Sequence, residues 1–170
     1  MADRVLHTER LVLRPLTPLS ASQLLNSSTD DGFPGAEDTR ILESVAARSD
    51  DEVAGIYVVE REGHPVGTLG VSGQLSPDGD QELGYALVPS ARGLGLGTEA
   101  VGALCAVLER APGVRRLTAE VRPGNEPSLR LLRRLGFVET DGGSTGHQLL
   151  ARTPAGSASL TRRIVGKHVC

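Results

Sequence analysis

The chain has 170 residues and a formal charge of −3, and 39% of it is hydrophobic and 23% charged. This length suits one domain with a well-buried core, and the composition is ordinary for a globular protein. Aromatic residues make up only 2% and no apolar stretch approaches the roughly 20 residues of a membrane helix, so neither nucleic acid nor membrane is an expected partner. Two cysteines exclude a disulfide framework or a cysteine-rich metal site. Because the N-terminus lacks a signal-peptide core, we expect a cytoplasmic protein.

The net charge hides a division between the two halves of the chain. Residues 1–90 hold six arginines against fifteen acidic residues, which gives −9, and residues 91–170 hold twelve basic against six acidic residues, which gives +6. Such a division indicates one cationic and one anionic ligand, although a chance scatter of surface charge explains it equally well.

The hydrophobic pattern changes period along the chain. The first half predicts an edge strand at 8–16, helices at 18–26 and 36–48, and strands at 53–60, 66–72 and 82–88. The second half predicts helices at 97–110 and 125–135 and strands at 114–121, 137–140 and 147–152. The fold class is therefore α+β: an antiparallel meander followed by alternating strands and helices. We expect a single domain over 1–152, followed by a tail at 153–170 of unassigned structure.

A glycine-rich loop separates the strand at 82–88 from the following helix. Gly93, Gly95 and Gly97 occupy alternate positions, and glycine lets the backbone approach a ligand closely. The helix N-terminus adds free N–H groups and a partial positive charge, and Arg92 adds a full one. The loop therefore predicts an anion site suited to phosphate.

Two nucleotide-binding motifs resemble parts of this loop. A Walker A loop must end in Gly-Lys-Ser/Thr, whereas this loop ends in Gly-Thr-Glu. A dinucleotide fingerprint is formally met by Gly95, Gly97 and Ala100, with Glu120 about 20 residues further on. Only seventy residues follow Ala100, too few to complete a doubly wound sheet. An NAD-dependent oxidoreductase is thus a remote alternative, and a purely structural turn is another.

Several motifs resemble one family. Arg92, Gly95 and Gly97 form R-x-x-G-x-G, which resembles the acetyl-CoA pyrophosphate loop of the GNAT superfamily of N-acetyltransferases. Four further motifs resemble the RimJ/RimL-like branch of this superfamily and follow one another in the order expected there. They are TERLVLR at 8–14, ELGY at 82–85, NEPS at 125–128 and RLGF at 134–137. The resemblance implies a three-layer fold: a mixed sheet of about six or seven strands, helices on both faces, and splayed fourth and fifth strands.

The resemblance also implies a reaction. Acetyl-CoA would be the co-substrate, no metal would be needed, and the acetyl group would pass directly to a primary amine of a protein N-terminus or a small cationic molecule. Backbone groups around Leu87 and Val88 would pair with the pantetheine arm. The implied cofactor-binding residues are Leu87, Val88, Arg92, Gly93, Leu94, Gly95, Leu96, Gly97, Thr98, Asn125, Ser128 and Arg134.

Two residues are candidates for catalysis. An amine must lose a proton in the reaction, and the resemblance implies Glu82 as the base. Ser128 would donate a hydrogen bond to the leaving sulfur, since the family's usual tyrosine on the following helix is missing. Glu82 facing solvent or pairing with an arginine, and Ser128 merely capping its helix, are the alternatives. Asn125 would bind the pantetheine, cap the helix, or do both.

The acceptor pocket implied by the resemblance lies in 27–43. This segment contains Asp30, Asp31, Glu37 and Asp38, which favour a cationic acceptor, or else form a solvated acidic loop. Phe33 is its only aromatic residue. Neither the acceptor nor the choice between monomer and homodimer follows from the sequence. A catalytically silent acyl-CoA-binding module on the same fold is the main alternative to an enzyme.

Overall fold

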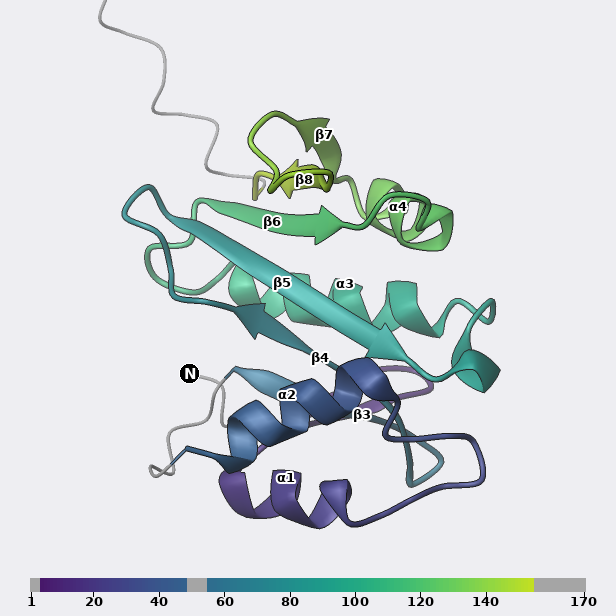
Figure 1. Cartoon of the computed structure of the whole chain (residues 1–170). Helices are drawn as coiled ribbons and strands as arrows, with labels where there is room; N and C mark the ends of the chain where they lie inside the picture. Colours follow the sequence, from purple (N-terminus) through teal and green to yellow (C-terminus); the bar gives the residue numbers. More distant parts are fainter. Residues whose placement is uncertain (1–3, 49–54, 155–170) are drawn as a thin grey trace, which may run out of the picture.

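The computed structural model describes residues 4–48 and 55–154, and an eight-stranded sheet runs through them (Figure 1). In chain order the strands are β1 (Leu6–His7), β2 (Val12–Pro15), β3 (Ile56–Arg61), β4 (His64–Ser72), β5 (Asp80–Leu87), β6 (Arg116–Val121), β7 (Val138–Thr140) and β8 (Gln148–Arg152). The helices are α1 (Pro18–Leu25), α2 (Ala36–Ala46), α3 (Leu96–Leu108) and α4 (Glu126–Arg134), with a 3-10 turn at Pro89–Ala91. In space the strands follow the order β1-β2-β3-β4-β5-β6-β8-β7.

Helices cover both faces of this sheet. Helices α1 and α2 lie side by side in front of it and α3 lies behind it (Figure 1). Asp38 of α2 accepts hydrogen bonds from the Thr68 hydroxyl of β4, at 2.7 Å, and from the Gly35 N–H, at 3.1 Å. On the other face, α3 buries Leu104 and Cys105 in the core. The predicted three-layer α+β arrangement is confirmed. Its antiparallel meander from β1 to β5 is not the parallel sheet that the dinucleotide alternative requires.

The N-terminal segment does not form the single edge strand predicted at 8–16. The Thr8 N–H donates to the Leu11 carbonyl at 3.0 Å, and the Thr8 hydroxyl accepts from the Leu11 N–H at 3.0 Å. Threonine hydroxyls that bond to nearby backbone groups favour turns over continued strand. The segment therefore becomes a hairpin in which β1 is the edge and β2 pairs on both sides. This split is why the sheet has eight strands instead of six or seven.

Strands β5 and β6 run parallel but pair only at their beginnings. Asp80, Gln81 and Glu82 face residues 116–118 of β6, after which the two strands diverge (Figure 1). On its other side, β5 stays paired with β4 as far as Leu87. A gap therefore opens in the middle of the sheet along the second half of β5. This is the predicted splay.

The remaining predicted elements agree with the structure to within a few residues. Asn125 is the N-cap of α4 as predicted, and Gly136 follows that helix with a φ of +81°. The first residues of the strand predicted at 53–60 and most of the tail predicted at 153–170 lie outside the described residues. Within the described part of the chain, none of the helices has the length and apolar character needed to cross a membrane.

Candidate active site

A cavity of about 590 Å³ lies beside the gap, on the side of α3 and α4. The end of β5, the glycine loop and the first turns of α3 and α4 form its walls. Nine of the predicted cofactor-binding residues line it: Leu87, Arg92, Gly93, Gly95, Gly97, Thr98, Asn125, Ser128 and Arg134. Val88, Leu94 and Leu96 do not; Val88 and Leu96 are buried in the core, and Leu94 is exposed.

The charge of this first cavity is strongly positive. Arg92, Arg130 and Arg134 line it, and Glu37 is the one acidic residue among the described residues that do so. Helix α3 begins directly after Gly95, so its first N–H groups add to the positive potential. Arg130 was not predicted, because nothing in the sequence separates it from the other arginines of α4. The cavity thus has the positive charge that the predicted anion site requires.

The three loop glycines serve two different purposes. Gly93 and Gly95 have φ values of +73° and +78°, a region that other residues rarely adopt. Gly97 has ordinary helical geometry, but a Cβ there would approach Leu131 Cδ1 to 2.8 Å. Gly97 is therefore required by the close approach of α3 to α4, whereas Gly93 and Gly95 shape the loop.

The gap exposes backbone groups of β5 at alternate residues. The Val88 N–H donates to the Val66 carbonyl at 2.9 Å, and the Val88 carbonyl accepts from the Ala91 N–H at 3.0 Å. Because hydrogen bonds in an antiparallel pair alternate in direction, the groups of Tyr85 and Leu87 point away from β4 into the gap. Arg92 Nε donates to the Leu87 carbonyl at 2.8 Å, so only the N–H of Leu87 is available to a ligand in the gap. The expected backbone pairing at Val88 is therefore wrong, and the available groups belong to Tyr85 and Leu87.

A second cavity of about 600 Å³ lies on the α2 side of the gap. Glu37 and Glu120 line it together with Arg48 and Arg122, so its charges balance. A Cβ added to Gly84, in the middle of β5, would meet no atom within 4 Å, which shows open space above the strand. The two cavities share five lining residues: Glu37, Tyr85, Ala86, Asn125 and Ser128.

Ser128 lies where the two cavities meet. Asn125 caps α4 by accepting from the Ser128 backbone N–H at 3.3 Å, so the cap does not use the Ser128 hydroxyl. The Tyr85 hydroxyl approaches Ser128 from β5, is buried, and makes no hydrogen bond of good geometry with any described residue. Burial raises the pKa of Tyr85, and the nearness of Ser128 offsets this only in part. Ser128 is thus the neighbour of a buried hydroxyl whose hydrogen bonding is incomplete, and a ligand atom between the two cavities could complete it.

The predicted base Glu82 points to the same face as α2. Thr68 faces α2, because it bonds to Asp38, and it pairs in register with Ala86. Side chains alternate along a strand, so Gly84 and Glu82 share the face of Ala86. The Glu82 side chain is half-buried and does not line either cavity, although Gly84 lines the second.

Glu120 of β6 lies on the same face as Glu82. Glu82 pairs with Thr118, and Glu120 follows two residues later. Burial raises the pKa of Glu82, and the neighbouring Glu120 carboxylate raises it further. Ser144 lowers the pKa of Glu120 by donating its hydroxyl at 2.6 Å and its backbone N–H at 3.0 Å. The sequence analysis does not place Glu120 at this site and names it only as a ribose ligand of the dinucleotide alternative. The sequence feature that could have pointed to Glu120 is its position in the strand directly before the NEPS motif.

The structure does not bring the three predicted acceptor residues to the site. Asp30 and Asp31 are exposed between α1 and α2, Phe33 is 1% exposed in the core, and none of them lines either cavity. Glu37, from the same acidic segment, lines both cavities and accepts from Arg122 Nη2 at 2.8 Å.

Comparisons with known proteins agree with this geometry. A family model described as an acetyltransferase (GNAT) domain matches residues 10–138. The human alpha/beta-tubulin-N-acetyltransferase 9 is 38% identical over 64 residues, covering 38% of this chain and 31% of that protein. The chain thus matches less than a third of the length of this curated relative.

Solved structures share the fold. A putative GNAT-family acetyltransferase from Bordetella pertussis has a TM-score of 0.66 at 28% identity, covering 88% of this chain and 99% of that one. The ribosomal alpha-N-protein acetyltransferase RimL, in complex with coenzyme A, has a TM-score of 0.67 at 18% identity, covering 88% and 98%.

A mixed sheet that opens beside an arginine-lined glycine loop is the architecture of an acyltransferase domain that uses coenzyme A thioesters. The family match covers most of the chain, and the chain belongs to the GNAT acetyltransferase family. The resemblance seen in the sequence motifs is confirmed, and RimL of the RimJ/RimL-like branch has the same fold.

Proposed function

We propose that the protein transfers the acetyl group of acetyl-CoA to a primary amine. The observation that carries this proposal is the meeting of two cavities of different charge at Ser128, in the gap between β5 and β6. The positive cavity suits the phosphates of the acyl donor, and the cavity beside Glu120 suits an amine. A binding module would need the first cavity but not the second.

The residues present fit coenzyme A. Arg92, Arg130 and Arg134 would hold its phosphates together with the N–H groups of the glycine loop. The exposed backbone of Tyr85 and Leu87 would bond to the amides of its arm. When bound, acetyl-CoA supplies an acyl group activated as a thioester.

The acceptor amine would lose its proton to Glu82. A carboxylate with a raised pKa is a better proton acceptor at neutral pH than one with a lowered pKa. When the pKa values of two neighbouring carboxylates shift in opposite directions, one carboxylate can exchange a proton while the other stays ionised. Glu82 would take the proton directly or through water, and Glu120 would stay ionised and attract the cationic amine.

Hydroxyl groups would donate hydrogen bonds to the leaving sulfur. Ser128 lines both cavities, and the Tyr85 hydroxyl lies beside it with its proton held by a raised pKa. Both are hydrogen-bond donors. A thiolate is a tolerable leaving group, so hydrogen bonding to the sulfur suffices without full proton transfer.

A protein N-terminus is the acceptor that these features favour. An α-amino group has a pKa near 8, against about 10.4 for a lysine side chain, so it loses its proton more easily. The balanced charges of the second cavity suit a terminal amine followed by uncharged backbone. The printed name of RimL describes the same chemistry for that protein. A small cationic amine is the other candidate.

Thermal unfolding with and without acetyl-CoA tests the binding half of the proposal. A ligand at 100 times its dissociation constant adds about 2.7 kcal/mol, and for a domain of this size the melting temperature should rise by several degrees. NADH is the comparison ligand and should give no shift. A shift with NADH alone would contradict the proposal.

Free-thiol release tests the catalytic half. Peptides with free N-termini and small polyamines serve as acceptors, and Ser128→Ala and Tyr85→Phe are compared with the unmodified protein. We expect acetyl-CoA binding to persist in both variants while turnover falls at least several-fold. Binding without turnover in the unmodified protein, whatever amine is offered, would instead identify a silent acyl-CoA-binding module.

A further inference from the structure

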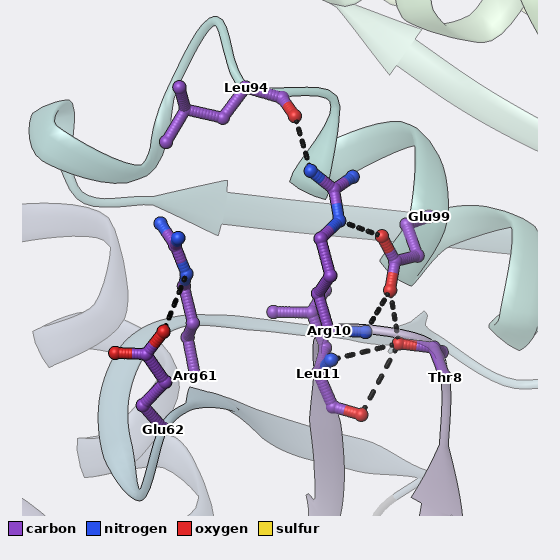
Figure 2. A network of polar contacts seen from close by, with 7 residues as sticks. All are labelled: Thr8, Arg10, Leu11, Arg61, Glu62, Leu94 and Glu99. Atoms are coloured by element: carbon purple, nitrogen blue, oxygen red, sulfur yellow. Dashed lines mark hydrogen bonds and ion pairs between the residues drawn. The ribbon is translucent and has the colours of Figure 1, made fainter.

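The opening motif at 8–11 plays no part in the site described so far, yet it touches the glycine loop. Figure 2 shows the turn between β1 and β2 beside the loop and the first turn of α3. Arg10 reaches from the turn to both of them. Its side chain is 42% exposed, so hydrophobic burial does not explain its position.

Arg10 binds the loop and the helix through separate groups. Its Nη1 donates to the Leu94 carbonyl at 2.8 Å, and its Nε donates to Glu99 Oε2 at 2.7 Å (Figure 2). Its backbone N–H donates to Glu99 Oε1 at 2.7 Å, and the Thr8 hydroxyl donates to the same oxygen at 2.5 Å. A Cβ on Gly95 would lie 3.4 Å from Arg10 Nη2, so the guanidinium packs directly against the loop.

These contacts remove two obstacles to anion binding. A carbonyl that faced the anion would repel it, and Arg10 binds the Leu94 carbonyl on the side of the β1–β2 turn. Glu99 adds a negative charge to the first turn of the helix whose N-terminus receives the anion. Burial works against ionisation of Glu99, but the bonds from Thr8 and Arg10 lower its pKa below the ordinary value, so the charge is present and Arg10 balances it.

We propose that Arg10 is a positioning residue that fixes the loop at 92–97 in its anion-receiving conformation, acting through Leu94 and Glu99 without touching the acetyl group. The proposal rests on the proposed function, because the anion is the pyrophosphate of coenzyme A. A loop fixed in advance loses less conformational entropy when the ligand binds. Arg10 therefore contributes to the affinity for the phosphate end of the ligand and not to the chemistry at Glu82 or Ser128.

Calorimetry with two ligands tests this role. Coenzyme A carries the pyrophosphate, and pantetheine is the same arm without phosphates. In Arg10→Ala we expect the dissociation constant for coenzyme A to rise on the order of tenfold, while that for pantetheine stays unchanged. The matched control is Arg14→Ala, on the adjacent strand, which removes a surface ion pair with Glu60 and should change neither constant.

A conservative variant separates positioning from charge. Arg10→Lys keeps the positive charge but cannot bridge Leu94 and Glu99 with a planar fork, so it too should weaken coenzyme A binding several-fold. If Arg10→Lys binds coenzyme A as tightly as the unmodified protein, or if Arg10→Ala weakens pantetheine equally, the positioning role is overturned. An unmodified protein that binds no coenzyme A would overturn the proposed function itself, and this role with it.

Discussion

At the scale of single residues, Glu82 and Glu120 are distinguished by what surrounds them. Glu82 is half-buried and interacts with Glu120, and burial and this like charge both raise its pKa. Glu120 is exposed, and its bonds to Ser144 lower its pKa. The shape of the pH profile therefore depends on which carboxylate accepts the proton.

Replacing Glu120 tests this assignment. With Glu82 as the base, kcat/KM rises as pH rises through the pKa of Glu82, because only the ionised form accepts a proton. In Glu120→Gln the like charge is gone, so the pKa of Glu82 falls and the acid limb moves to lower pH. The limb should move only in part, since burial is the larger cause of the shift. The measurement is kcat/KM against pH.

Two further variants complete this test. Glu82→Gln should abolish the acid limb and lower kcat by about 10²-fold or more. Glu43→Gln, at an exposed position of α2, is the matched control and should leave the profile unchanged. Loss of turnover in Glu120→Gln with a normal profile in Glu82→Gln would instead assign the base to Glu120.

Residue types alone predicted part of this site. Asn125 and Ser128 belong to a motif at the start of α4, Arg92 belongs to the loop motif before α3, and the structure places all three at the first cavity. The motif that contains Tyr85 does not reveal that its hydroxyl lies beside Ser128, because β5 and α4 are far apart in sequence. Phe33 was expected at the acceptor, but burial in the core is the stronger demand on an aromatic side chain.

At the scale of elements, the packing of α3 on α4 sets the shape of the first cavity. Both helices contribute lining residues, and Gly97 lets them approach because a side chain there would collide with Leu131. Leu131 is partly buried and lines the first cavity, so its side chain would have to shift to make room for the added methyl. The separation of the helices is therefore coupled to the size of a single residue.

Gly97→Ala should destabilise the protein. The added methyl would lie 2.8 Å from Leu131 Cδ1, and overpacking of this kind costs about 1–3 kcal/mol, which exceeds the gain from replacing a helical glycine. Urea unfolding measures the change. Gly102→Ala is the matched control on the same helix, where the nearest atom is 3.4 Å away, and its stability should be unchanged or slightly higher. Equal stability of both variants would contradict the packing role of Gly97.

Element boundaries were predicted well where the chain signals them locally. Asn125 and Gly136 mark the ends of α4, and both act as caps in the structure. The β1–β2 turn was missed because its cause is a threonine hydroxyl bonding to Leu11, which alternation does not reveal. The placement of β8 between β6 and β7 is a long-range pairing, and local sequence carries no signal for it.

At the scale of the whole molecule, the two oppositely charged halves of the chain meet at the gap. The basic half supplies the arginines of the first cavity, and the acidic half supplies Glu37, which lines both cavities. A net charge of −3 would by itself repel an anionic ligand. The local field of the cavity must therefore exceed that of the whole protein, and it does so at short range.

The affinity for coenzyme A should accordingly depend on salt. Exposed charges are screened over about 10 Å at 0.1 M ionic strength and about 3 Å at 1 M, so the dissociation constant should rise steadily with added salt. Calorimetry in a series of sodium chloride concentrations measures the slope, with pantetheine as the uncharged control. Equal slopes for the two ligands would show that the arginines do not contact the phosphates.

The order of motifs predicted the family and the fold, but not the acceptor. The second cavity is built from α2, the end of β4, the middle of β5 and the end of β6, which are far apart in sequence. The charges of Arg48 and Arg122 cancel those of Glu37 and Glu120 only once these segments come together. The charge of the second cavity therefore does not follow from the acidic segment at 27–43 alone.

Because β5 pairs with β6 over only a few residues, the second half of β5 has an unpaired side, like an edge strand, although it lies in the middle of the sheet. Tyr85 and Leu87 present backbone groups there, as an outermost strand does, and water must satisfy them whenever the gap holds no ligand. An incoming arm with amide groups exchanges those water contacts for its own at little net gain. We therefore expect the gap to add little to affinity and to favour molecules whose amide groups match the spacing of the missing strand.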